Sequence, residues 1–426
     1  MLSQAGDAPL RIYSSLPETD QAQPEEVARS GADQVLPPTV SKRTRDVERA
    51  ITLALEEADG KAGDFDVEYT ALDASDASGA SPDALIQANA RRAAADDRTA
   101  VYIGDFTSGA SQQSIPILSR AHVAQISPAS TRVGLTREDA LTDLDEPGRY
   151  YRDGVRNFVR IVPPDTVQAR ALVAVMKDDD CTRVAMIHDG SPYGRALADE
   201  IRAANHGRVR FAFSQAVAPY GRFGRLVIRA SRARPRPNCF VYSGSRNPNT
   251  VQIFKAFADA LPGAKLYGTD GQVTASFYDP SESGLPARLE GRVKVMVPPR
   301  SLDRYTKFED AFARRFGDDH PDPYAVYGYE AMRLALDAIS RSRTGKRADI
   351  VTALTSTLEQ VRSAIGPYSI DRGDTDEQDY GVATISDGRL NPPAHAPTLR
   401  SVDRSAHTMR ARAQSRSQAV SASLGA

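Results

Sequence analysis

Residues 100–131 read AVYIGDFTSGASQQSIPILSRAHVAQISPAST. The run 100–103 predicts one strand and 124–127 predicts the next, because both are short, apolar and bounded by turn-forming residues. Residues 111–121 between them are predicted to form a helix. Since a helix joins the two strands, they must run parallel with a right-handed crossover. The stretch therefore predicts an α/β fold built on a parallel sheet.

The same alternation continues on both sides of this stretch. Before it, strands and helices are predicted in turn over residues 10–14, 47–57, 65–72 and 81–95. After it, a second alternating run spans 156–268, and a third section runs from 291 to 385. Two α/β sheets that share a third section are typical of two lobes linked by crossing strands. They are less typical of two independent domains.

Two segments lack this alternation. Residues 18–38 contain three prolines among polar residues and are predicted to form an enlarged surface loop. Residues 398–426 are rich in Ser, Ala and Arg, carry five arginines against one aspartate, and show no apolar periodicity. We predict that 398–426 is a disordered basic tail.

The composition excludes several classes of function. The 426 residues hold 54 Lys and Arg against 55 Asp and Glu, and the net charge of −1 favours neither nucleic acid nor an anionic membrane surface. No apolar run is as long as a membrane helix, and the N-terminus shows no signal-peptide pattern. With two cysteines, six scattered histidines and no metal-binding motif, we expect neither a metal nor a cofactor.

The sequence shows no complete catalytic motif. Residues 104–109 follow a predicted strand and open a helix, as a phosphate-binding loop does, but Ala110 stands where such a loop requires lysine. Pro192 occupies the nucleophile position of the turn 190–194. His188 ends a strand, and no motif supplies it with a nucleophile. We therefore predict that the chain is not an enzyme.

Two loops at predicted strand ends offer anion-binding chemistry instead. Residues 107–109 and 127–131 lie just beyond the carboxyl ends of parallel strands, where open α/β sheets bind ligands. Hydroxyls and free backbone N–H groups at a helix N-terminus hold a carboxylate without a charged partner. The alternative is that these residues only cap helices. Two such loops on consecutive strands favour a binding site.

A series of segments, in order along residues 9–390, carries a resemblance to a known family. The segments are 102–110, 115–118, 125–131, 134–136, 157–163, 184–190, 193–197, 267–271 and 324–331. They resemble the type I periplasmic binding proteins, and among these the leucine/isoleucine/valine-binding family of ABC importers. The resemblance implies two doubly wound parallel-sheet lobes joined by three hinge crossings. Lobe 1, which docks the ligand, is expected to contain residues 9–157 and 291–365. Lobe 2, which closes over the ligand, is expected to contain residues 158–290 and 366–392.

The resemblance also implies which residues contact the ligand. Ser108, the backbone of Ala129, and Thr131 stand at positions that hold the α-carboxylate of an amino acid. Tyr193 corresponds to a tyrosine that closes over the ligand, and Asp270 to the acid that pairs with its α-ammonium group. The alternative for Asp270 is a plain Asp-Gly turn, which is common at strand ends.

The chain departs from the family at two places. The enlarged loop at 18–38 replaces a short segment that often touches the ligand side chain in relatives. Where relatives often have aromatic residues, residues 245–247 read Ser-Arg-Asn, so we expect a more polar side-chain subsite with Arg246 among the ligand contacts. The implied function is extracytoplasmic capture of an amino acid or similar small molecule by hinge closure, by a monomer that delivers it to ABC importer permease subunits. The alternative is a ligand-sensing or regulatory receptor subunit with the same bilobed fold.

The two cysteines fall in the second predicted sheet. Cys181 lies just before the strand 183–188, and Cys239 begins the strand expected beside it, so both lie near the same edge of the sheet. A disulfide between them is geometrically attainable and suits an exported protein. The alternative is two small buried apolar residues.

Overall fold

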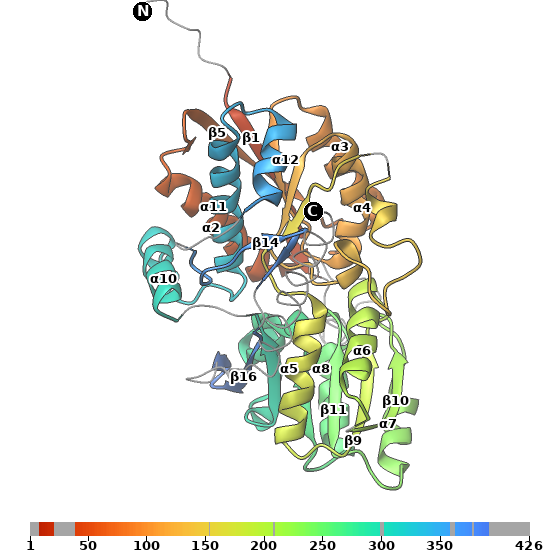
Figure 1. Cartoon of the computed structure of the whole chain (residues 1–426). Helices are drawn as coiled ribbons and strands as arrows, with labels where there is room; N and C mark the ends of the chain where they lie inside the picture. Colours follow the sequence, from red (N-terminus) through yellow and green to blue (C-terminus); the bar gives the residue numbers. More distant parts are fainter. Residues whose placement is uncertain are drawn as a thin grey trace, which may run out of the picture.

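The computed structural model describes residues 8–20, 39–152, 154–207, 209–298, 302–357, 363–376 and 379–391. Figure 1 shows two lobes, one above the other, each with a central sheet between helices. This confirms the predicted fold class. The basic tail at 398–426 and most of the loop at 18–38 lie outside the described residues.

Lobe 1 is built on a six-stranded sheet in the order β4-β5-β1-β6-β7-β8. From β5 to β8 the strands run parallel, and only the edge strand β4 is antiparallel. The strands are β1 (Leu10–Leu16), β4 (Lys61–Ala62), β5 (Phe65–Asp73), β6 (Thr99–Ile103), β7 (Ala124–Ser127) and β8 (Phe158–Arg160). A small hairpin of β2 (Thr19–Asp20) and β3 (Thr39–Val40) lies apart from this sheet.

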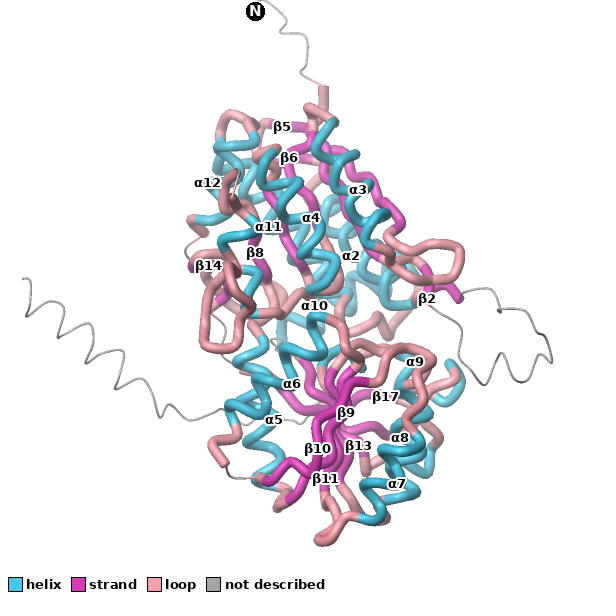
Figure 2. The backbone as a smooth tube through the Cα atoms, turned by 90° about the vertical axis from the view of Figure 1, so that its right-hand side faces the viewer, coloured by secondary structure: helices cyan, strands magenta, loops and turns pink. Residues whose placement is uncertain are grey.

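Helices cover both faces of the lobe 1 sheet, as Figure 2 shows. One face carries α2 (Lys42–Glu57), α11 (Ala325–Ser342) and α12 (Arg347–Thr355), and α10 (Leu302–Phe316) packs against α2. The other face carries α3 (Asp83–Ala95) and α4 (Ser108–Arg120). Neighbouring strand residues face opposite layers: Ile12 belongs to the core under α2 and α11, and Tyr13 to the core under α3 and α4.

Lobe 2 is built on a seven-stranded sheet in the order β10-β9-β11-β12-β13-β16-β17, in which only the last two strands run antiparallel to their neighbours. The strands are β9 (Arg183–His188), β10 (Arg210–Ala216), β11 (Cys239–Ser243), β12 (Lys265–Gly268), β13 (Val293–Val297), β16 (Gly381–Ser386) and β17 (Arg389–Asn391). Its helices are α5 (Asp165–Asp178), α6 (Pro192–Ala204), α7 (Gly224–Arg232), α8 (Thr250–Ala260) and the short α9 (Ala275–Tyr278). The pair α5–α6 and the pair α7–α8 pack on opposite faces.

The chain changes sheets a few residues later than expected. β8 pairs with β7 in lobe 1, although the boundary was expected at 157. β13, expected in lobe 1, pairs with β12 in lobe 2. A hairpin of β14 (Ile370–Asp371) and β15 (Asp374–Thr375), expected in lobe 2, packs against β8 of lobe 1. Short apolar strands suit either sheet, and only their hydrogen-bond partners decide which sheet they join.

Helix α4 begins three residues before its predicted start because a polar first turn is invisible to apolar periodicity. Thr107 caps it, with Oγ1 accepting the N–H of Ala110 at 3.3 Å. The same holds for α2, where Ser41 is the cap and the buried face begins with Thr44.

A disulfide joins Cys181 to Cys239, whose Cα atoms are 5.8 Å apart. It closes a loop across a sequence separation of 58 residues, so loop entropy alone is worth about 4 kcal/mol of stability. It ties the start of β11 to the approach to β9, its neighbour in the sheet. Within the described part of the chain, no helix is long and apolar enough to cross a membrane.

Candidate functional site

Lobe 1 contributes two loops that follow the neighbouring strands β6 and β7. The first leads into α4, and the second covers residues 128–132. The hydroxyls of Ser111 and Ser130 are 2.8 Å apart and tie the loops together. Ser127 Oγ donates to the carbonyl of Asp105 at 2.8 Å, which fixes the start of the second loop. Both loops lie at the carboxyl ends of parallel strands, as predicted from the sequence.

Ser108 is the first residue of α4 and is 2% exposed. Its Oγ accepts the N–H of Arg132 at 3.2 Å, so the hydroxyl proton of Ser108 can be donated elsewhere. The first-turn N–H groups of α4 have no partner within the helix and carry the positive end of its dipole. Beside them, the Ala129 N–H donates to Ser127 Oγ at 3.3 Å. The first turn of α4 and the Ser108 hydroxyl thus form a neutral surface suited to a carboxylate. The Ala129 N–H, predicted to contact the ligand, is engaged by Ser127 in this arrangement.

Lobe 2 presents Asp270, which begins a short 3-10 helix after β12. Thr269 and Gln272 form a capping box around it, and its own N–H donates to Gln168 Oε1 at 3.0 Å. The aspartate is 2% exposed, so its carboxylate faces protein groups rather than bulk water.

Three tyrosine hydroxyls donate to the Asp270 carboxylate. Tyr193 at the start of α6 donates to Oδ1. Tyr324 donates to Oδ2 at 3.0 Å and Tyr380 donates to the same oxygen at 2.7 Å. Burial raises the pKa of each tyrosine well above its usual range, and the nearby carboxylate adds to the rise, so the hydroxyls stay protonated donors. Tyr324 precedes α11 of lobe 1, and this bond therefore spans the two lobes.

Beside Asp270 lies a group of buried polar atoms without hydrogen-bond partners among the described residues. They are Thr131 Oγ1, both carboxyl oxygens of Asp165, and Gln168 Nε2. Burial raises the pKa of Asp165 to about 8, and the charge of Asp270 adds to the rise, although the nearby Thr131 hydroxyl opposes it. Asp165 is therefore largely neutral at pH 7 and can donate a proton to a hydrogen bond.

The two lobes also touch beside the site. Arg132 of lobe 1 is 3% exposed and donates to the carbonyl of Pro192, the first residue of α6, at 3.0 Å. The buried carboxylate of Glu146 holds Arg132 at 2.8 Å. At the surface, Arg195 and Asp143 are 3.7 Å apart across the same junction. These contacts hold the lobes together in the observed arrangement.

A cavity between the lobes brings most of the predicted site residues together. It is lined by Arg43, Phe106, Thr107, Ser108, Ala129, Tyr193, Ser245, Asp270, Gly271 and Tyr324. Its volume is about 20 Å³, which is room for about one water, so an amino acid enters only when the lobes separate. Two predicted residues are not in the lining. Thr131 is buried in the polar group described above, and Arg246 lies next to the lining, where its N–H donates to the Gly271 carbonyl at 3.0 Å.

Several residues of the site were not predicted from the sequence. Arg43 and Phe106 line the cavity, and Tyr324 and Tyr380 bind Asp270. Tyr324 stands in a segment that carries the family resemblance, and this was the only signal for it. Arg43 sits in the polar run KRTRD, which looks like an ordinary solvated first turn. These residues meet only because separate segments converge on one cleft.

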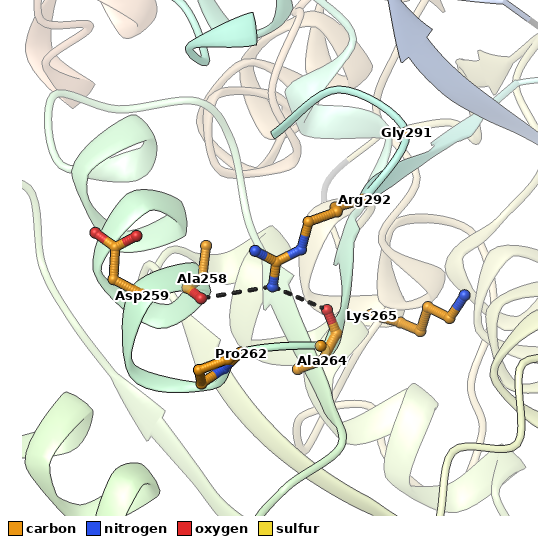
Figure 3. Close-up of a pocket in the computed structure, with 8 residues that line it drawn as sticks. Ala258, Asp259, Pro262, Ala264, Lys265, Gly291 and Arg292 are labelled. Atoms are coloured by element: carbon orange, nitrogen blue, oxygen red, sulfur yellow. Dashed lines mark hydrogen bonds between the residues drawn. The ribbon is translucent and has the colours of Figure 1, made fainter. Parts of the chain in front are cut away.

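A second cavity of about 560 Å³ opens at the surface of lobe 2 (Figure 3). There the Arg292 guanidinium donates to the carbonyls of Ala258 at 3.5 Å and Ala264 at 3.4 Å. It also donates to Leu261, the capping residue of α8, at 3.4 Å. Arg292 thus satisfies carbonyls at the end of a helix, a structural role. This cavity lies away from the residues that meet at Asp270.

Comparison with known proteins identifies the family. The sequence pattern of the family described as Periplasmic binding protein matches residues 41–389. The chain belongs to the periplasmic binding protein family. It is of type I, as the sequence predicted, and this family consists of solute-binding proteins rather than enzymes.

Proteins similar to this chain are named for, or were solved with, different ligands. The Leu/Ile/Val-binding protein homolog 1 of Brucella suis is 23% identical over 295 residues, which are 67% of this chain and 69% of that protein. A leucine-binding protein from Thermotoga maritima shares the fold with a TM-score of 0.72 and 21% identity, over 90% of this chain and 98% of the other. A solute-binding protein of R. palustris in complex with benzoate has a TM-score of 0.69 and 16% identity, over 91% and 96%.

Proposed function

We propose that this protein captures an amino acid in the cleft between its lobes and presents it to the permease of an ABC importer outside the cytoplasmic membrane. One observation carries the proposal. A neutral, dipole-lined surface at Ser108 in lobe 1 and a buried carboxylate, Asp270, in lobe 2 line the same cavity. An α-amino acid offers a carboxylate and an ammonium group a few ångströms apart, and these two surfaces suit them.

Each end of the ligand has its own partner in this arrangement. The ligand carboxylate binds the first turn of α4 and the Ser108 hydroxyl, where helix dipole and hydroxyl stabilise it without a cation. The ligand ammonium binds Asp270. A carboxylate has about four lone-pair sites, and three hydroxyls occupy three of them, so one is left for the ammonium.

Binding is coupled to movement of the lobes because the observed cavity is too small for an amino acid. Ligand docks on lobe 1 while the lobes are apart, and lobe 2 then closes through the crossings that follow β8, β13 and β15. In this proposal, Tyr193 and Asp270 cover the ligand once the lobes are closed. The permease then recognises a surface that exists only when the lobes are closed.

The direct test is a binding panel of the twenty standard amino acids together with benzoate, read as a shift in melting temperature. A ligand that binds only the folded state raises stability by about 2.7 kcal/mol at a hundredfold excess over its dissociation constant. We expect shifts with one or a few amino acids. Shifts with benzoate and with no amino acid would contradict the proposal and point to a carboxylate carrier without an ammonium site.

A further inference from the structure

The unassigned feature of the cleft is Arg43, in the first turn of α2. Its guanidinium lies over the ring of Phe106, 5.2 Å from the centroid, and over the ring of Tyr324 at 5.7 Å. The two rings meet edge to face with centroids 5.2 Å apart. All three side chains line the interlobe cavity. The aromatic pair thus holds a positive charge at the edge of the ligand site.

Arg43 differs from the other cations on its helix. Lys42, Arg45 and Arg49 each have a carboxylate of Asp46 within ion-pair distance, and Lys42 also pairs with Asp318 at 2.8 Å. No acid among the described residues forms an ion pair with Arg43, and its Nε is buried without a hydrogen-bond partner. A buried donor without an acceptor destabilises the folded protein, so such a group calls for an explanation, and a bound ligand would supply the acceptor.

One buried acid lies near enough to feel this charge. Burial raises the pKa of Asp322 to about 6, and the charge of Arg43 opposes this rise. Asp322 Oδ1 accepts the N–H of Tyr324 at 2.9 Å, its own N–H donates to the Asp46 carboxylate at 3.0 Å, and its Oδ2 is buried without a hydrogen-bond partner. The acid therefore lies in the junction between α2 and α11 and attracts Arg43 through space, but no ion pair joins the two side chains.

A count of charges then indicates what Arg43 meets. Among the residues that line the cavity, Arg43 and Asp270 are the two ionised side chains. In the proposed function, the ligand ammonium binds Asp270 and the ligand α-carboxylate binds the dipoles of α4. Arg43, which is partly buried, then lines the cavity without an ion-pair partner among the described residues. A further carboxylate on the ligand would supply that partner as the cleft closes, and a neutral amino acid has none to offer.

We infer that the ligand is an amino acid with an acidic side chain, and that Arg43 binds its distal carboxylate. The inference rests on the proposed function. The guanidinium fork matches a carboxylate with two parallel hydrogen bonds, which distinguishes the acid from its uncharged amide. The residue is therefore specificity-determining for the amino acid that this protein captures.

Titration calorimetry with two isosteric pairs tests the inference, with L-glutamate against L-glutamine and L-aspartate against L-asparagine. In wild type, we expect one acid to bind at least roughly tenfold tighter than its amide, as one charge-assisted hydrogen-bonded contact provides. Arg43→Gln should weaken the acid by a similar factor and change the amide by less than about threefold. Arg43→Lys keeps the charge but loses the guanidinium fork, so its affinity for the acid should lie between those of wild type and Arg43→Gln. Arg45→Gln, two residues along the same helix, is the matched control and should behave as wild type.

The outcomes separate this inference from the proposed function. If wild type binds an amide or leucine more tightly than either acid, the role of Arg43 is refuted and amino-acid capture stands. If Arg43→Gln weakens acids and amides equally, Arg43 holds the α-carboxylate and the acidic ligand class is wrong. If wild type binds no α-amino acid, both proposals fail. If Arg43→Gln does not fold, as judged by its ligand-free melting curve, Arg43→Lys provides the test. The ratio of its affinity for the acid to its affinity for the amide should then be smaller than that of wild type.

Discussion

Replacing Asp270 by asparagine removes the charge at the centre of the cleft and keeps the size of the side chain, at a position that is 2% exposed. The amide oxygen still accepts hydroxyls, but the amide nitrogen cannot, so at least one tyrosine hydroxyl loses its acceptor. In the proposed function the lost charge is the one that binds the ligand ammonium, and a ligand without that group separates this loss from the change in tyrosine hydrogen bonds.

The burial of Asp270 sets the expected magnitude. Removing one partner of a desolvated charge pair costs on the order of 2–5 kcal/mol, whereas an exposed pair is worth about 0–1 kcal/mol. Asp270→Asn should therefore weaken the amino-acid ligand by a factor of roughly thirty or more. In the proposed site, Ser108→Ala removes one hydrogen bond to the ligand carboxylate and should cost less, about 1.5–3 kcal/mol.

The assay is titration calorimetry of wild type and both variants, with the amino acid and with its deaminated analogue. The analogue has no ammonium group, so its affinity should change much less in Asp270→Asn, while Ser108→Ala should weaken both ligands alike. Equal affinity of wild type and Asp270→Asn for the amino acid would refute the reasoning and remove Asp270 from the site. An equal loss for ligand and analogue would show that Asp270 only holds the lobes together.

Three further predictions follow from individual contacts. Tyr324→Phe removes an interlobe hydroxyl and should increase the radius of gyration of the ligand-free protein in small-angle scattering, whereas Tyr380→Phe removes a hydroxyl from the same oxygen within lobe 2 and should not. Burial raises the pKa of Asp165 from 3.8 to about 8, so between these pH values the folded state holds a proton that the unfolded chain releases. The free energy of unfolding should therefore fall as pH rises from about 4 to about 8. Asp165→Asn should flatten this fall in urea titrations. Unreduced, unfolded protein should show no free thiol, and Cys181→Ala should lower the melting temperature; a count of two thiols would contradict the disulfide.

The fold could be predicted from the sequence because apolar periodicity is a local property. The unit at residues 100–131 appears in the structure as β6, α4 and β7, with strand bounds within a residue of those predicted. Sheet membership is not local. β13 reads as an apolar strand whichever sheet it joins, and nothing within Val293–Val297 states that its partner is β12 rather than a strand of lobe 1.

The same distinction applies to the site. The loops at Ser108 and Ala129 could be predicted because strand ends and helix N-termini can be located along the chain. Tyr193 was predicted through the family resemblance, but its hydrogen bond to Asp270 was not, and neither were Tyr324 and Tyr380. The three tyrosines come from the start of α6, the approach to α11 and the approach to β16, and only the crossing of the chain between lobes brings their hydroxyls to one carboxylate.

In the proposed function, this convergence lets one residue both recognise the ligand and respond to closure of the lobes. In the observed arrangement Asp270 is solvated by hydroxyls from both lobes and has no cation among the described residues. When the lobes separate, the Tyr324 bond is lost and water replaces it, at a net cost of about 1.5–3 kcal/mol for a hydrogen bond to a charged group. An ammonium ion in the cleft changes this balance, since its attraction to the carboxylate strengthens as closure excludes water. The ligand therefore stabilises the closed arrangement more than the open one. This difference in affinity shifts the population of protein molecules toward the closed arrangement.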